Sequence, residues 1–89
     1  MKDLSQIRRE IDAIDDKIKA LFLERMALAL EVAEYKAANK LPVLNETRER
    51  EIIARVCAGE SGERAEQMKV LFGTLFSLSR SAQNNATEK

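Results

Sequence analysis

The chain has 89 residues, of which 45% are hydrophobic and 34% charged, with three glycines and one proline, a composition typical of a helical bundle. Its 15 basic and 15 acidic residues cancel, and since nucleic-acid-binding modules normally carry a basic excess, the charge argues against a nucleic-acid partner. Histidine is absent and Cys57 is the only cysteine, which excludes an intrachain disulfide, most zinc sites and histidine-dependent nucleophilic catalysis.

The first residues, Met1 to Ser5, contain no apolar signal-peptide segment. No apolar run elsewhere is long enough to cross a bilayer. The sequence therefore predicts a cytoplasmic location and no membrane partner.

A long amphipathic helix is predicted from about Leu4 to Ala38, because no Gly or Pro precedes Pro42. Its large apolar residues recur at steps of three and four, which places them on one helical face. This face, called the seam below, consists of Leu4, Ile7, Ile11, Ile14, Ile18, Leu21, Leu28, Val32 and Tyr35. The one break in the seam is Arg25, whose guanidinium cannot lose its proton and needs an anionic partner if it is buried.

The length of this helix predicts self-association. At 1.5 Å per residue the helix is roughly 48 Å long, whereas a compact monomer of this size would be only about 30 Å across. The helix would protrude with its seam exposed, and such a stripe is commonly covered by a second copy of the chain. We therefore expect a homo-oligomer.

A second helix is predicted after a linker at residues 39–44, where Pro42 prevents the first helix from continuing. Asn45 is a favourable N-cap for this helix, which is expected to run to about Ala58. Its apolar face consists of Ile52, Ile53, Val56 and Cys57.

A third helix is predicted from about Glu63 to Gln83, after a turn at residues 59–62. The side chains expected to face inward are Met68, Leu71, Phe72, Leu75 and Phe76. The polar tail at residues 84–89 is expected to fray. Because no repeat or domain boundary is visible, residues 1–89 should form one all-α domain of three helices with a core at about 4–83.

Polar side chains interrupt or border the apolar faces of all three predicted helices. Arg25 and Lys36 are eleven residues apart, close to three turns, and so share a face of the first helix. Ser79 and Gln83 are neighbours on one face of the third helix. The other polar residues of interest are Arg8, beside the seam, and Arg48 and Glu49, at the edge of the second helix's apolar face.

Arg8 and Arg25 are about 25 Å apart along the helix axis. One chain could not easily bring both to one small molecule, whereas an antiparallel partner chain could. Taken singly, each of these cations is more often a solvated surface residue. For Arg25, a buried ion pair with a glutamate of the same protein that fixes helix register is an alternative to ligand binding.

The order and spacing of these residues resemble the all-helical chorismate mutases. The resemblance covers about residues 4–83 and rests on four motifs: the opening Ile7-Arg8-Arg9-Glu10-Ile11-Asp12-Ala13-Ile14-Asp15, the Arg25–Lys36 spacing, Arg48-Glu49 soon after Pro42, and Ser79 four residues before Gln83. The resemblance implies an intertwined helical homodimer with two equivalent sites, each of which uses one arginine from the partner. It also implies the conversion of chorismate to prephenate, an intramolecular Claisen rearrangement that leads into phenylalanine and tyrosine synthesis and needs no nucleophile, metal or cofactor.

The resemblance assigns a role to each polar residue. Arg25 and Arg8 of the partner subunit would clamp the two substrate carboxylates, with Ser79 and Arg48 in support. Lys36 and Gln83 would donate hydrogen bonds to the ether oxygen, where negative charge develops as the C–O bond breaks. Glu49 would accept a hydrogen bond from the ring hydroxyl. Asn45 stands where the family usually has Asp, and it can still cap the helix and present its backbone N–H.

Two other functions stay open at this level. One is isochorismate pyruvate lyase, a relative with the same fold and a similar cationic pocket, although an apolar residue would be expected there in place of Glu49. The other is a non-catalytic helical dimerisation module. Such a module would not show saturable binding of small dianions.

Overall fold

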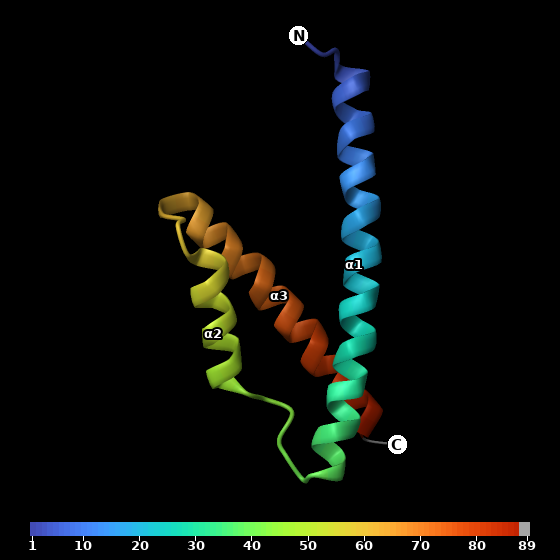
Figure 1. Cartoon of the computed structure of the whole chain (residues 1–89), viewed down its shortest axis with the longest axis vertical. Coiled ribbons are helices and arrows are strands. Elements are labelled where there is room, and N and C mark those ends of the chain that lie inside the picture. The colour runs from blue at the N-terminus through green and yellow to red at the C-terminus, as the bar shows by residue number, and fades with distance from the viewer. Residues whose placement is uncertain (88–89) are drawn as a thin grey trace.

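The computed structural model describes residues 1–87 and contains three helices and no strand within that range (Figure 1). The helices are α1 (Leu4–Ala38), α2 (Glu46–Cys57) and α3 (Gly62–Thr87). The all-α prediction is therefore confirmed, and the bounds of the first helix are those expected. Within the described range, none of the helices is long and apolar enough to span a membrane.

Local signals account for where α1 and α2 begin. Asp3 caps α1 by accepting from the Gln6 backbone N–H at 2.9 Å, and the Gln6 side chain accepts in return from the Asp3 N–H at 3.1 Å. Asn45 caps α2 through Oδ1, which accepts from the Arg48 N–H at 3.0 Å. These bonds satisfy backbone donors that have no partner inside the helix.

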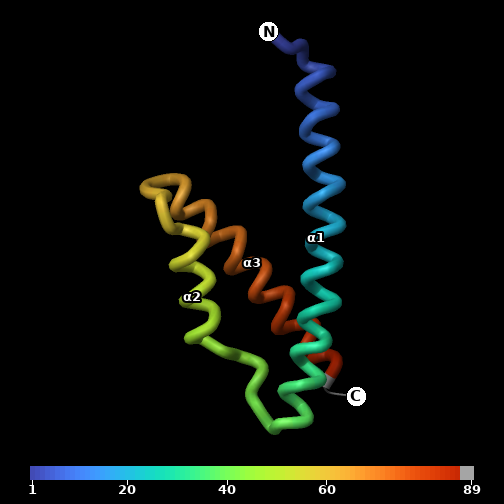
Figure 2. The backbone as a smooth tube through the Cα atoms, viewed as in Figure 1, coloured from blue at the N-terminus to red at the C-terminus, as the bar shows by residue number. Residues whose placement is uncertain are grey.

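The third helix packs against both of the others. Figures 1 and 2 show α3 crossing the C-terminal half of α1, with α2 on the other side of α3. The buried apolar side chains are Ala29 and Ala33 from α1, Ile52 from α2 and Phe76 from α3. Small alanines on α1 allow the two long helices to approach closely, so the core lies where α3 meets its neighbours.

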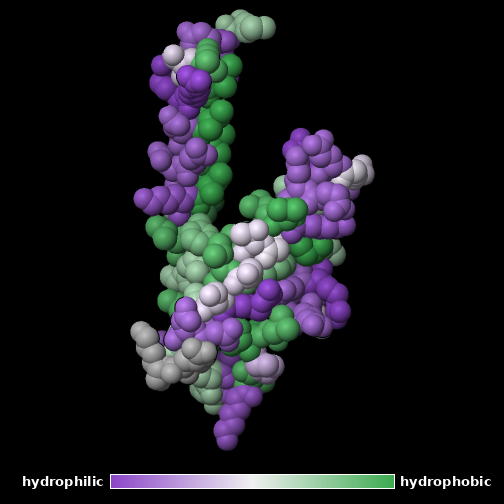
Figure 3. Space-filling model, turned by 180° about the vertical axis from the view of Figure 1, so that it is seen from behind, coloured by the Kyte–Doolittle hydropathy of each residue, from purple (hydrophilic) through white to green (hydrophobic). Residues whose placement is uncertain are grey.

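The seam is not part of this core. Its nine apolar residues are between 41% and 66% exposed. Figure 3 shows an apolar stripe along the projecting N-terminal arm of α1, where the first part of the seam lies. The molecule measures 56 × 28 × 14 Å, so it is an extended chain with a free helical arm. An uncovered stripe of this length is unusual for a soluble monomer.

Two expectations about α3 were wrong. The helix does not end at Gln83 but continues to Thr87, because the intervening residues include no Gly or Pro to stop it; residues 88 and 89 lie outside the described range. Leu71 does not face inward but is 50% exposed, beside exposed Val70. Both lie on the side of α3 that neither α1 nor α2 covers. The other residues expected to face inward are buried or half-buried.

Candidate active site

A cleft of about 280 Å³ opens between α1, the linker and α2, with α3 as its floor. Six of the predicted site residues line it: Arg25, Lys36, Asn45, Arg48, Glu49 and Ser79. Apolar residues, among them Val32, Val43 and Ile52, fill the spaces between them. Each helix therefore contributes polar side chains to one hollow, which is the usual arrangement of a small-molecule site.

Arg25 is held in the cleft without a carboxylate partner. Its Nη1 donates to Ser79 Oγ at 3.3 Å, and its guanidinium carbon lies 5.9 Å from the centre of the Phe76 ring. No ion pair joins it to any carboxylate of residues 1–87. The register-fixing Arg–Glu pair, which the sequence left open, is therefore not formed among the described residues of one chain, and the half-buried guanidinium can take an external anion.

Lys36 is half-buried and points to the linker, where its Nζ donates to the Val43 carbonyl oxygen at 2.6 Å. An ammonium carries three donors. This bond fixes the end of a flexible side chain at the cleft and leaves two N–H groups for another acceptor.

On α2, Arg48 and Glu49 differ in how firmly they are held. Arg48 is 57% exposed and lies 3.9 Å from the Glu51 carboxylate, a distance too long for a strong pair. Glu49 accepts a hydrogen bond from Arg80 Nη1 across the α2–α3 boundary.

Arg80 also lines the cleft, and the sequence analysis missed it. It comes four residues after Phe76 and three before Gln83, so a helical projection of α3 would have placed it on the same face. With Arg25, Lys36 and Arg48 it gives the cleft four cationic side chains against the single carboxylate of Glu49. In a chain of zero net charge, this local excess selects for anionic ligands.

Two predicted site residues do not line the cleft. Arg8 lies on the projecting arm of α1, exposed, 17 residues before Arg25 and so about 25 Å away along the helix. Gln83 is buried one turn beyond Ser79, and its Oε1 has no hydrogen-bond partner among the described residues. The single chain therefore assembles most, but not all, of the predicted site.

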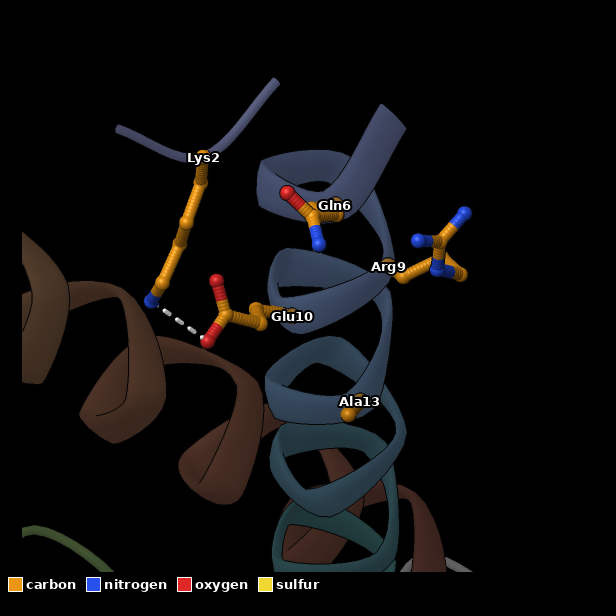
Figure 4. Close-up of a pocket in the computed structure, with 5 residues that line it drawn as sticks. All are labelled: Lys2, Gln6, Arg9, Glu10 and Ala13. Atoms are coloured by element: carbon orange, nitrogen blue, oxygen red, sulfur yellow. Dashed lines mark hydrogen bonds and ion pairs between the residues drawn. The ribbon is translucent and has the colours of Figure 1, made fainter. Parts of the chain in front are cut away.

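A second hollow lies near the start of α1 (Figure 4). It is lined by Lys2, Gln6, Arg9, Glu10 and Ala13, with an ion pair of 2.7 Å between Lys2 and Glu10. Both members of that pair are more than half exposed, and the lining comes only from the first turns of α1 and from Lys2, which precedes the N-cap of that helix. Because no other element closes over it, this hollow lacks the convergent groups of a ligand site.

The chain is similar in sequence to known chorismate mutases. The chorismate mutase type II family matches residues 7–84. A bifunctional chorismate mutase/prephenate dehydratase of Aquifex aeolicus is 41% identical over 56 residues, which are 63% of this chain and 16% of that protein. A chorismate mutase of Methanocaldococcus jannaschii is also 41% identical over 56 residues, 63% of this chain and 57% of that protein.

A bifunctional chorismate mutase/prephenate dehydratase of Escherichia coli K12 is 40% identical over 53 residues, 60% of this chain and 14% of that protein. The chain thus matches between about one seventh and somewhat over half of the length of these relatives. No solved structure matches the chain significantly. The family match covers α2, nearly all of α1 and α3, and every predicted site residue, and the chain belongs to the chorismate mutase type II family.

Proposed function

We propose that this chain converts chorismate to prephenate. The observation that carries the proposal is the convergence of Arg25, Lys36 and Arg48 on one cleft in which Arg25 forms no ion pair with a carboxylate of residues 1–87. Chorismate brings two carboxylates to such a site. The named relatives and the family match support the same activity.

Orientation of the substrate is the first contribution of the site. A guanidinium binds a carboxylate through two parallel hydrogen bonds, and the contacts of Arg25 with Ser79 and Phe76 fix its plane before the substrate arrives. Clamping both carboxylates holds the flexible enolpyruvyl arm over the ring. This converts a rare reactive conformer into the bound one, an effect that can supply several kcal/mol of the barrier.

Electrostatic stabilisation is the second contribution. As the C–O bond breaks, negative charge grows on the ether oxygen, and the two N–H groups that Lys36 does not use for Val43 are available to it. We assign Gln83 as the second donor, because it follows Ser79 by one turn and is buried. Donors that are already oriented stabilise the transition state more than the substrate.

The remaining cleft residues have supporting roles in this proposal. Arg48 helps to bind a substrate carboxylate, and Glu49 accepts a hydrogen bond from the ring hydroxyl. The Asn45 side chain caps α2 and so places the backbone N–H groups of the first turn at the cleft. Together with Gln83, these residues would supply orientation, charge and hydrogen bonds, which are what an intramolecular rearrangement requires.

A homodimer completes the site in this proposal. The exposed seam needs cover, and a second copy running antiparallel would bring Arg8 of the partner subunit to the cleft that holds Arg25. The cytoplasmic location stays a prediction from the sequence.

The activity is tested by incubating the protein separately with chorismate and with isochorismate and identifying the products. Chorismate should disappear with equal formation of prephenate, and Lys36→Met should slow this by about a hundredfold or more, the usual cost of removing one transition-state donor. Salicylate and pyruvate as products would instead establish a lyase. If chorismate is neither converted nor bound saturably, that result would favour the dimerisation module.

Dimerisation is tested by placing the same charge on opposite faces of the α1 arm. Ile14→Lys puts an ammonium in the seam, whereas Asp16→Lys puts it two residues away on the opposite side of the helix. In a dimer, a lysine in the seam would be buried away from water without a carboxylate to pair with. Ile14→Lys should therefore sediment as a monomer at micromolar concentration and lose activity. Asp16→Lys should remain dimeric and active. A wild-type protein that is monomeric yet active would contradict the shared site.

A further inference from the structure

We infer that Arg80 is a positioning residue of this site. Arg80 holds the Glu49 carboxylate where that carboxylate can accept a hydrogen bond from the ring hydroxyl of the substrate. The inference rests on the proposed function and adds to it a residue that neither the sequence motifs nor the assigned donors include. Its basis is the hydrogen-bonded ion pair between Arg80 Nη1 and Glu49 Oε2 on the lining of the cleft.

The pair is partly shielded from water, since the two side chains are 33% and 26% exposed. Every other ion pair in residues 1–87 joins side chains that are more than half exposed. A hydrogen bond between charged groups is about twice as strong as a neutral one, and shielding reduces the competition from water. Of the ion pairs described, this one is therefore the best suited to fix a side chain.

Two consecutive residues of α3 tie down opposite walls of the cleft. Ser79 accepts from Arg25 of α1, and Arg80 donates to Glu49 of α2. Neighbouring residues on a helix point about 100° apart, so one position of the floor helix can reach α1 while the next reaches α2. The substrate would enter between the two side chains that are held in this way.

An anchor for Glu49 matters because of its surroundings. Glu49 is the only carboxylate on the lining, and the cations proposed to bind substrate carboxylates share that lining. A free carboxylate there would pair with one of those cations, and the substrate would have to displace it. With Oε2 occupied by Arg80, the carboxylate is held on its own wall and Oε1 is available to accept the ring hydroxyl.

The experiment compares two substrates: chorismate and an analogue in which hydrogen replaces the ring hydroxyl. Arg80→Met keeps the length of the side chain but removes its charge, and it should lower kcat/KM for chorismate about tenfold, chiefly through KM. For the analogue the loss should shrink to less than about threefold, because the hydroxyl contact is gone. Glu49→Ala should show the same preference between the substrates, and Arg64→Met, at an exposed arginine of α3, should change neither value.

Arg80→Lys retains a charge that can reach the carboxylate and should recover most of the activity on chorismate. It also replaces Arg80→Met as the test if circular dichroism shows that the methionine variant does not fold. Equal losses on both substrates would overturn the inference, because a purely structural role does not depend on the hydroxyl. If the wild type converts chorismate but Arg80→Met loses equally on both substrates, only the role of Arg80 is overturned. If the wild type is inactive on chorismate, the proposed function is overturned and this role with it.

Discussion

Arg8→Ala and Arg25→Ala are each expected to be nearly inactive on chorismate, and a mixture of the two is expected to regain activity. Loss of one charge-assisted contact to a bound carboxylate typically costs about 2–5 kcal/mol, so the activity of each variant alone should fall by about thirtyfold or more. If each site combines Arg25 of one chain with Arg8 of the partner subunit, a mixed dimer contains one site that lacks both arginines and one intact site. Each heterodimer should therefore show about half of the wild-type activity.

The measurement is kcat for the variants alone and after mixing and re-equilibration, with subunit exchange followed by mass spectrometry. Arg25→Ala mixed with Lys36→Ala is the matched control. Both residues line the same cleft, so every site in that heterodimer lacks one of them and no recovery is expected. Absence of recovery for the Arg8 and Arg25 pair, despite proven exchange, would mean that Arg8 does not serve the partner's site.

The helices could be predicted from the sequence because their ends carry strong local signals. Pro42 prevents α1 from continuing, and Asn45 gives α2 its cap. The end of α3 has no such signal, since only polar residues and alanine follow Gln83. Polarity alone does not end a helix, and for this reason α3 runs four residues further than expected.

The choice of packing surface was harder to predict. The large residues of the seam suggest the main contact of α1, but within the chain α1 packs through Ala29 and Ala33. Periodicity identifies an apolar face without identifying what covers it. It could therefore predict that the seam needs a partner, but not that α3 would lie against the alanines.

The site was predicted where residues break an apolar pattern and missed where they do not. Arg25 interrupts the seam, and Ser79 extends an apolar stripe, so both are visible in the sequence. Arg80 shares a helical face with Phe76 and Gln83, but its sequence position alone does not show that α2 lies close enough for Arg80 to reach Glu49. Arg8 needs a second chain to be placed at all, so its role stays a proposal.

The second large effect is expected from Gln83→Glu, whose activity relative to wild type should fall steeply as pH rises. The proposed role of Gln83 is to donate a hydrogen bond to the ether oxygen, and its amide does not titrate. A carboxyl group at this position can donate only when it is protonated. An ordinary glutamate ionises near pH 4.3, and burial at position 83 disfavours the charged form, so the new group should titrate above that value.

The quantity to measure is the ratio of kcat/KM for Gln83→Glu to kcat/KM for wild type, from pH 5 to 8. Taking the ratio cancels the titration of groups that both proteins share. Below the pKa of the introduced carboxyl the ratio should be level. Above that pKa the ratio should fall about tenfold per pH unit, because the carboxylate then places negative charge beside an oxygen that is itself becoming negative.

The control is Gln67→Glu, at an exposed position of α3, which should give a level ratio throughout. A level ratio for Gln83→Glu as well would show that Gln83 does not donate to the reacting oxygen.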